Sequence, residues 1–502
     1  MTHLDEFINS NVLGELYYGN SGSSEESSVL FTNPLADITA AFENQISDAF
    51  QSIENALKKG FFVSGYFSYE LGYFLDTTGC EFQPNGNPLL HFRVYTEKHD
   101  IPSKECHDAF QKYVSAQTND YWIKDIRQSI SKEAYRNQIE KIHEYIKNGD
   151  TYQVNFTFKL LSEFYGNPFC LFYDLSRVQK TSYTVFMKFS DRTILSFSPE
   201  LFFLHSNDTL TLKPMKGTIK RGMNPQEDEI QTKLLSESEK TKAENLMIVD
   251  MERNDLGKIC PPGGVCVDSL FDIEKYETLF QMTSTIRALC KDDTPLSKII
   301  YALFPSGSVT GAPKIRTMQI IQELEKEPRG IYTGALGFIH PKGGAIFNIP
   351  IRTIEHNPTD QTLVMGVGSG IVADSEAEDE YRECLLKGKF LTDRQKDFQL
   401  IETMRWDSKT GYFLLDEHLE RLKQSSDYFH ITCDIDKIKE GLKAYSQFFD
   451  SNLSYRVRLL HFADGHTEYT HTPLKTDTDL PCTIILDRTH TVNQNDLFLF
   501  HK

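Results

Sequence analysis

The chain has 502 residues, of which 39% are hydrophobic and 25% are charged, a composition typical of a globular protein with more than one domain. Asp and Glu outnumber Lys and Arg by 71 to 53, and the net charge of -18 argues against a nucleic-acid partner. No stretch approaches the roughly 20 apolar residues of a membrane span, and the nine cysteines form no C-x-x-C pair, so we expect a cytoplasmic protein without a membrane partner or a disulfide framework.

The first 125 residues form a mixed N-terminal segment. Ser21 to Ser28 (SGSSEESS) has the small polar residues of a flexible loop, and Gly60 to Tyr73 is a strand-like run. From Asp125 to Gly149 apolar residues recur at steps of three and four, which predicts a helix.

The rest of the chain divides at a short polar stretch. Aromatic and β-branched runs alternate with helical patterns over 126–391, which we expect to form the catalytic region. Thr392 to Asp397 (TDRQKD) is the expected linker, and 398–502 is a separate unit. Runs of strands beside separate helices indicate an α+β fold rather than a regular βαβ array.

Lys216 lies in the segment KPMKGTIKRG, between a proline and a Gly-Thr pair, and we expect a turn there. A lysine that a turn directs into a cleft loses water, its pKa falls, and the neutral amine becomes a nucleophile. A solvated surface lysine is the alternative, because three other basic residues lie nearby.

Several carboxylates on either side of Lys216 are also candidate site residues. Glu200 comes just after the strand-like run Thr193 to Phe197, either as a site residue or as an acid at a helix N-terminus. Glu244 shares a helix face with Met247, Ile248 and Met251, where a carboxylate must be paired or bind a cation. A second acidic helix is predicted at Glu376 to Phe390.

On that second helix Glu376, Glu380, Glu383 and Lys387 form one stripe, which is either a solvated face or part of a site. A hard cation such as Mg²⁺ accepts carboxylates from two helices together with water and substrate oxygens.

Two glycine- and serine-rich segments complete the candidate site. Phe304 to Lys314 (FPSGSVTGAPK) and Met365 to Ser375 (MGVGSGIVADS) are predicted turns whose backbone N–H groups could cradle an anion. Neither matches a P-loop or a dinucleotide fingerprint. Arg352 could clamp a carboxylate or serve a structural ion pair.

Taken together, these segments resemble the chorismate-utilising enzymes, which include anthranilate, aminodeoxychorismate, isochorismate and salicylate synthases. The resemblance covers about residues 60 to 391. It rests on GDTYQVN, SPE, AENLMIVDMERND, FPSGSVTGAPK, RGIYTGALG and MGVGSGIVADS, in that order. It implies two packed β-sheets flanked by helices, with the active site between them.

The resemblance also implies roles for individual residues. Glu244 and Glu383, with Glu380 close by, would bind Mg²⁺, and Glu200 would protonate the departing C4 hydroxyl of chorismate. Substrate binding would involve Arg352, Thr310, Gly311, Gly366, Gly368, Ser369, Gly370 and Lys387.

Two positions separate the subfamilies. Isochorismate and salicylate synthases have a lysine base where this chain has Gln153, so activation of water is not expected. Lys216 is typical of aminodeoxychorismate synthases, in which the lysine adds to C2 and ammonia then attacks C4. Gln281 and Thr241 depart from common family residues, a histidine and an acid, and Thr241 puts a third carboxylate near the metal in doubt.

The C-terminal unit resembles the opening of a class IV pyridoxal-phosphate enzyme, an aminodeoxychorismate lyase. Arg421, in HLERL, matches the arginine that grips the cofactor phosphate, and Lys502 matches the cofactor lysine. Because the chain stops at that lysine, we expect neither a complete lyase nor bound pyridoxal phosphate.

The resemblance therefore implies Mg²⁺-dependent amination of chorismate to 4-amino-4-deoxychorismate, in 4-aminobenzoate and folate biosynthesis. An anthranilate synthase component and a non-catalytic regulatory subunit are the alternatives. The sequence contains no glutaminase motif, so ammonia would come from a separate glutamine amidotransferase subunit.

Overall fold

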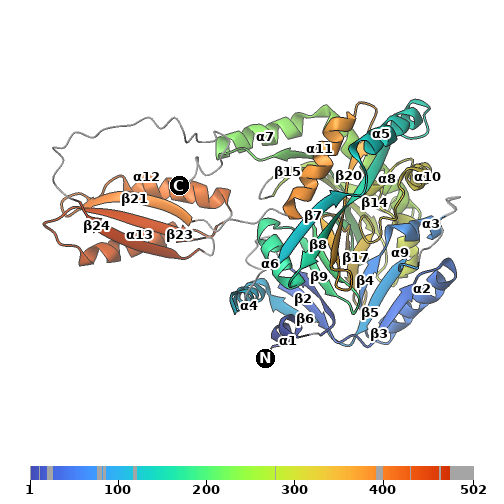
Figure 1. The fold of residues 1–502 in the computed structure, drawn as a ribbon, viewed down its shortest axis with the longest axis horizontal. Coiled ribbons are helices and arrows are strands. Elements are labelled where there is room, and N and C mark those ends of the chain that lie inside the picture. Colours follow the sequence, from blue (N-terminus) through green and yellow to red (C-terminus); the bar gives the residue numbers. More distant parts are fainter. Residues whose placement is uncertain are drawn as a thin grey trace. The chain divides into compact units, whose positions relative to one another are not determined.

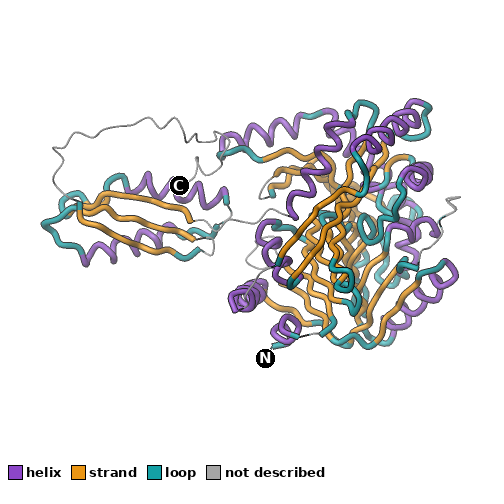
Figure 2. Tube along the Cα trace, in the orientation of Figure 1, coloured by secondary structure: helices purple, strands orange, loops and turns teal. Residues whose placement is uncertain are grey.

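The computed structural model describes residues 2–10, 12–19, 27–75, 82, 86–116, 121–276, 279–391, 399–429, 431–462 and 465–474. It divides into two compact units (Figures 1 and 2). The first unit contains Met1–Thr218, Leu235–Tyr276 and Gln281–Gln395, and the second contains Ile219–Leu234, Glu277–Phe280 and Lys396–Lys502. The expected loop at Ser21 to Ser28 lies largely, and the linker Thr392 to Asp397 entirely, outside the described residues.

Within the described part of the first unit, one ten-stranded sheet has the order β16-β8-β20-β19-β10-β9-β1-β2-β6, and β7 pairs with β8. Its strands, in that order, are Gly311–Ala312, Gln153–Tyr165, Thr362–Ile371, Thr353–Asn357, Thr193–Ser198, Tyr183–Lys188, Gly14–Tyr18, Ser27–Thr32, His99–Pro102 and, for β7, Trp122–Gln128.

A second ten-stranded sheet, counted over the same described residues, has the order β13-β15-β12-β11-β18-β17-β4-β5-β3, and β14 pairs with β15. Its strands are Met215–Lys220, Leu279–Leu289, Thr209–Lys213, Leu201–Ser206, Ala345–Asn348, Ala335–Ile339, Phe62–Phe67, Leu90–Tyr95, Ala36–Ala40 and, for β14, Val265–Lys275.

The two sheets pack face to face through an apolar layer to which both contribute. Val185 and Ile194 come from the first sheet, and Tyr66 and Leu336 come from the second. The fold class implied by the family resemblance, two packed sheets flanked by helices, is confirmed.

Helices cover the outer faces of both sheets (Figure 1). Helices α1, α4, α5, α6, α10 and α11 contribute to the core of the first sheet, and α2, α8 and α9 to that of the second. In chain order the helices are α1 His3–Asn9, α2 Glu43–Lys58, η1 Tyr69–Leu71, α3 Gly72–Leu75, α4 Ser103–Ala116, α5 Lys132–Lys147, α6 Pro168–Val178, α7 Pro225–Glu237, α8 Glu239–Gly257, α9 Leu296–Leu303, η2 Gly307–Val309, α10 Lys314–Leu324, α11 Ala377–Gly388 and η3 Lys389–Leu391. No helix in the described residues is long and apolar enough to cross a lipid bilayer.

The predicted helix from Asp125 begins later than expected. Helix α5 starts at Lys132, after Ser131, whose hydroxyl accepts a hydrogen bond from the Ala134 N–H and so caps the helix. Residues before Ser131 form strand β7, because the long neighbouring strand β8 supplies pairing partners. Likewise the strand-like run from Gly60 ends at Phe67 and continues as η1 and α3.

The second unit has its own core, formed by a four-stranded sheet and two helices. The sheet order, for the residues described, is β22-β21-β23-β24. The elements are β21 Gln399–Asp407, β22 Gly411–Tyr412, α12 Leu415–Tyr428, α13 Ile435–Tyr445, η4 Ser446–Phe448, β23 Tyr455–Phe462 and β24 Thr467–Pro473.

A segment from the middle of the chain packs on the end of α12. The Arg221 guanidinium lies 3.9 Å from the centroid of the Tyr428 ring and donates a hydrogen bond of 2.8 Å to the Tyr428 carbonyl. The Tyr428 hydroxyl donates to the Gly222 carbonyl at 2.7 Å, and Asp228 holds the other side of the guanidinium at 2.6 Å. This Arg221–Tyr428 contact makes 219–234 part of the second unit.

Candidate active site

Lys216 lies in strand β13, and the expected turn at this residue is wrong. The strand forms because β15 offers a long pairing partner, and the Ser284 N–H bonds to the Pro214 carbonyl at its start. Gly217 adopts a φ of +86° within this strand. A Cβ at this position would lie 2.0 Å from Thr241 Cγ2, so only glycine fits here. Lys216 is therefore held on a strand that contacts helix α8.

The Lys216 side chain is half-buried and surrounded by charges. Burial lowers its pKa, the carboxylates of Glu200, Glu244 and Glu383 oppose that effect, and the Lys387 ammonium adds to it. The structure thus brings together five residues that the sequence selected from four separate segments.

Glu200 lies in the connection between β10 and β11 and is 4% exposed. Because a strand follows it, the alternative of an acid at a helix N-terminus is wrong. Burial raises the pKa of Glu200 to about 7, while Ser308, the Lys216 charge and the Met215 backbone lower it. Such a carboxyl group can hold its proton near neutral pH and donate it.

The glycine-rich segment Gly366 to Gly370 is a strand and not the expected turn. It forms the second half of β20, and its residues pair with β8 from Lys159 to Asn155. Only the N–H groups that point toward β8, those of alternate residues, are used by this pairing and cannot also cradle an anion. Gly366, Gly368 and Gly370 lie on one face of the strand because side-chain positions alternate.

The glycines on this face admit close neighbours. A Cβ at Gly370 would lie 2.8 Å from Gln153 Nε2 and 3.6 Å from Lys216 Nζ. Gln153 is 1% exposed, and both polar atoms of its amide have no hydrogen-bond partner among the described residues. Gln153, Gly370 and Lys216 therefore form one small, tightly packed group.

The carboxylates expected to bind a metal lie near one another but are partly engaged. Burial raises the pKa of Glu244, the charges of Lys216 and Lys240 lower it, and those of Asp374 and Glu380 raise it. Glu383 pairs with Lys387 at 2.6 Å, and Glu380 accepts a hydrogen bond from Ser375 at 2.7 Å. No preformed group of three metal-ligating side chains occurs in the described part of the chain.

This donor set fits a cation that takes few protein ligands. Carboxylates gathered in one place are stabilised by a positive charge, and oxygen donors suit a hard ion. Mg²⁺ commonly takes one or two carboxylates and completes its coordination with water and substrate.

Other predicted substrate-binding residues are held by local contacts. The Thr310 hydroxyl donates to the Ser306 carbonyl at 3.0 Å, and Lys387 donates to the Gly368 carbonyl at 2.9 Å. Ser369 lies beside the Tyr135 hydroxyl at 3.4 Å. A Cβ at Gly311 would lie 2.0 Å from the Gln153 carbonyl oxygen, which explains the glycine.

Arg352 lies between β18 and β19 with a φ of +52°. Its guanidinium donates to Gln179 Oε1 at 2.7 Å, and burial lowers its pKa while Tyr276 raises it. The interactions described for Arg352 are therefore with neighbours other than Lys216 and Glu200.

In the second unit Arg421 binds a carboxylate of the protein itself. Its Nε donates to Glu402 Oε1 at 2.7 Å, and His418 Nδ1 lies 2.6 Å from the other carboxylate oxygen. Lys502 lies outside the described residues.

Sequence reasoning missed Glu252 and the side chains of Ser306 and Ser308. Glu252 is 2% exposed, burial raises its pKa to about 7, and Ser306 donates to it. The signal was present, because Glu252 lies four residues after Ile248 and four before Leu256 on the inward face of α8.

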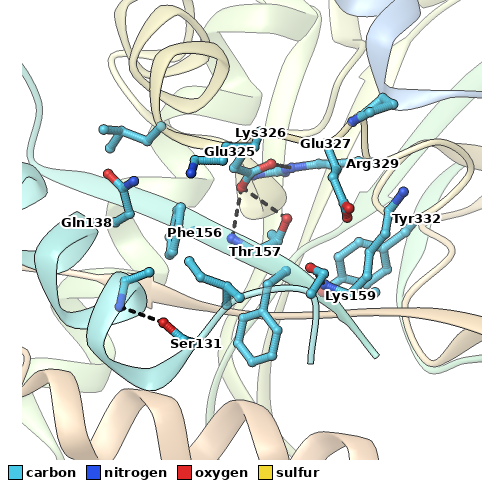
Figure 3. A pocket seen from close by; sticks show the side chains of 17 residues that line it. Ser131, Gln138, Phe156, Thr157, Lys159, Glu325, Lys326, Glu327, Arg329 and Tyr332 are labelled. Atoms are coloured by element: carbon cyan, nitrogen blue, oxygen red, sulfur yellow. Dashed lines mark hydrogen bonds and ion pairs between the residues drawn. The ribbon is translucent and has the colours of Figure 1, made fainter. Parts of the chain in front are cut away.

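A cavity of about 280 Å³ lies elsewhere on the first sheet (Figure 3). Glu325 is one of its lining residues and accepts hydrogen bonds from the Thr157 N–H and hydroxyl and from Arg329. Of the predicted site residues only Gly366 lines it. Four residues of strand, roughly 13 Å, separate Gly366 from Gly370, so this cavity does not mark the Lys216 centre.

The fold and this group of charged side chains define an enzyme class that has been seen before. Anthranilate synthase component I from Streptococcus pneumoniae has the same fold, with a TM-score of 0.64 and 27% sequence identity, over 73% of this chain and 92% of that one. Residues 15–393 match the chorismate binding enzyme family, and 399–493 match amino-transferase class IV. The chain belongs to the chorismate binding enzyme family.

Among curated proteins, aminodeoxychorismate synthase from Streptomyces pristinaespiralis is 41% identical over 266 residues, 53% of this chain and 37% of that protein. Aminodeoxychorismate synthase component 1 from Escherichia coli is 37% identical over 259 residues, 52% of this chain and 57% of that protein. The matched stretch therefore spans less than two thirds of either relative.

Proposed function

We propose that the chain converts chorismate and ammonia to 4-amino-4-deoxychorismate, in the route to 4-aminobenzoate and folate. The observation that carries the proposal is the half-buried Lys216, whose Nζ lies beside Gln153 and Gly370 and interacts with the buried Glu200. Two relatives that match about half of this chain are named aminodeoxychorismate synthases, which supports the same reaction.

The chemistry follows from the two shifted groups. Burial favours the neutral amine of Lys216, whose lone pair attacks C2 of chorismate. The C4–oxygen bond breaks at the same time, and Glu200, whose pKa near 7 keeps it partly protonated, gives the departing hydroxyl the proton that makes it water. Ammonia then bonds to C4, the C2–Nζ bond breaks, and Lys216 is released.

A magnesium ion would be held by Glu244 and Glu383, with Glu380 nearby. When bound, it would neutralise the carboxylates of the substrate and orient the ring. The raised pKa of Glu244 beside Asp374 and Glu380 supports a cation at this position. The residues proposed to bind the substrate are Arg352, Thr310, Gly311, Gly366, Gly368, Ser369, Gly370 and Lys387.

A separate glutamine amidotransferase subunit is the proposed source of ammonia. The relative from Escherichia coli is named component 1, which supports a second component. The purified chain should therefore use ammonium and not glutamine. Hydrolysis of glutamine by the chain alone would contradict this proposal.

Product identification tests the reaction against its alternatives. The full chain is incubated with chorismate, Mg²⁺ and ammonium, and the products are analysed by mass spectrometry. We expect an aminated product that keeps its enolpyruvyl group. Anthranilate, which has lost that group, would favour the reaction named for the Streptococcus relative, and no product at all would favour a regulatory subunit.

A further inference from the structure

Two buried carboxyl groups lie close together on different elements. Glu200 follows β10, and Glu252 is on the inward face of α8. Glu200 Oε1 and Glu252 Oε2 are both buried and have no hydrogen-bond partner in the described part of the chain. Two unpaired carboxylates are costly to bury, so the pair is more stable when it holds protons.

Two serine hydroxyls connect these carboxyl groups. Ser306 Oγ donates to Glu252 Oε1 at 2.9 Å and lies 3.1 Å from Ser308 Oγ. The Ser308 hydroxyl interacts in turn with the carboxyl group of Glu200. The four side chains form a chain from the Lys216 centre to helix α8.

The number of hydrogens fixes the direction of this chain. Ser306 has one hydroxyl hydrogen, and it is donated to Glu252. Ser308 must then donate to Ser306, and only a protonated Glu200 can donate to Ser308. Reversing all three hydrogen bonds places the proton on Glu252 instead, so the chain can carry one proton in either direction.

We propose that Ser306 and Ser308 relay a proton between Glu252 and Glu200, and that Glu252 is a positioning residue that restores the acid form of Glu200. The inference rests on the proposed function. The amination itself requires only one acid, Glu200. Glu252 is assigned a role because Ser306 and Ser308 connect it to that acid.

The proton balance closes over one turnover that starts with a proton on each of the two carboxyl groups, as the raised pKa of about 7 of both Glu200 and Glu252 allows. When Glu200 has given its proton to the departing hydroxyl, Glu252 donates to Ser306, Ser306 to Ser308, and Ser308 to Glu200. The negative charge then rests on Glu252, which interacts with the Lys314 ammonium. After ammonia has bonded to C4, the new ammonium gives a proton to Glu200, and the relay returns one to Glu252.

Charged groups of the described residues act on both carboxyls. Glu200 interacts with the Lys216 ammonium, and Glu252 interacts with Lys314, Asp255 and Glu200. Because each carboxylate makes the other harder to ionise, removing the Glu252 charge should lower the pH at which Glu200 loses its proton.

The test uses the full chain with two variants. Glu252→Gln keeps the shape and a hydrogen-bond acceptor but cannot carry the proton, and Ser306→Ala removes the link. For both we expect kcat to fall by about tenfold or more, with KM for chorismate within about twofold of the wild type. In Glu252→Gln the alkaline loss of activity should move to lower pH, and Glu252→Asp should restore part of kcat.

Ser284→Ala is the matched control, because Ser284 is a buried serine that donates to Asn245 and lies outside the relay. Its pH profile should not change. An unaltered kcat and pH profile in both relay variants would overturn the proposal.

A second measurement does not depend on activity. The infrared carbonyl band of protonated carboxyl groups, followed against pH without substrate, should titrate as a coupled pair in the wild type. Ser306→Ala should uncouple it, while Ser284→Ala should not. If the wild type forms no aminated product, the proposed function fails, but this titration still decides whether Glu200 and Glu252 share a proton. Identical titrations in the wild type and Ser306→Ala would contradict the proposed relay.

Discussion

Lys216 Nζ lies 3.6 Å from the position that a Cβ atom would take at Gly370. The strand that carries the glycine and the strand that carries the lysine belong to different sheets. The absence of a side chain at residue 370 therefore leaves the space in which an amine and a substrate atom could meet.

Gly370→Ala tests this relationship. The added methyl group would lie 2.8 Å from Gln153 Nε2, closer than side-chain carbons normally approach, and would occupy the space beside Lys216. We expect kcat/KM for chorismate to fall by at least about a hundredfold, with little change in thermal stability. Gly257→Ala is the control, since nothing lies within 4 Å of its added carbon, and it should behave as wild type. Normal turnover in Gly370→Ala would show that the space beside residue 370 is not used in the reaction.

A covalent intermediate on Lys216 is expected when ammonia is absent. A neutral amine can add to chorismate and then waits for ammonia to expel it. Peptide mapping after trapping with chorismate alone should find the adduct on Lys216 and none on Lys213, which pairs with Glu274. Lys213→Ala should keep its activity, and Lys216→Ala should lose it. Undiminished amination by Lys216→Ala would make this lysine structural.

The pH dependence of the rate follows from two opposite shifts. Burial lowers the pKa of Lys216, so its neutral form is gained as the pH rises through that lowered value. Burial raises the pKa of Glu200 to about 7, so its acid form is lost as the pH rises through 7. We expect a bell-shaped profile of kcat/KM whose alkaline limb lies near pH 7. Activity that rises steadily to pH 9 would show that the acid form of Glu200 is not needed.

Glu383→Gln is expected to abolish Mg²⁺-dependent turnover without unfolding the chain. The amide cannot supply the negative charge that a hard cation favours, and its ion pair with Lys387 is half-exposed and contributes little to stability. Titration of activity with Mg²⁺ and circular dichroism measure the two effects. Glu378→Gln on the same helix should remain active, because Glu378 pairs with Lys132 and Arg382. Near-normal turnover of Glu383→Gln at ordinary Mg²⁺ would contradict the metal role.

Tyr428→Ala should loosen the segment that follows Lys216. The substitution removes the ring under the Arg221 guanidinium and the hydrogen bond to the Gly222 carbonyl. Amide hydrogen exchange over 219–234 should become about tenfold faster, which corresponds to about 1.4 kcal/mol. Tyr428→Phe keeps the ring and should show a smaller effect. Equal exchange in all three proteins would mean that the Arg221–Tyr428 contact does not hold the segment.

Much of the architecture could be predicted from periodicity and from the family resemblance. Of the four apolar residues at helical spacing, Tyr135, Ile139 and Ile142 are buried on α5, and Ile146 is partly exposed. The failures arose where pairing partners far away in the sequence override local residue preferences. Pro214 and Gly217 favour a turn around Lys216, but β15 pairs with this stretch and makes it a strand.

The spacing of Glu252 from Ile248 and Leu256 places it on the inward face of α8, but its role depends on partners that come from other elements. A carboxylate on a helix could pair with any cation, and the sequence cannot show that Ser306 and Glu200 face it from other elements. Glu244 was selected because Met247, Ile248 and Met251 share its helix face, and the family motif then implied its role.

The Arg221–Tyr428 contact has a consequence for dividing this protein. Because 219–234 and the C-terminal sheet form one unit, the boundary between the two units is not a single point in the sequence. A stop codon after the first unit would leave Arg221 without the aromatic ring that covers it. A C-terminal fragment expressed alone would expose that ring to solvent. Either fragment expressed alone would therefore lack one side of the Arg221–Tyr428 contact, and we expect both to be less stable than the same residues in the full chain.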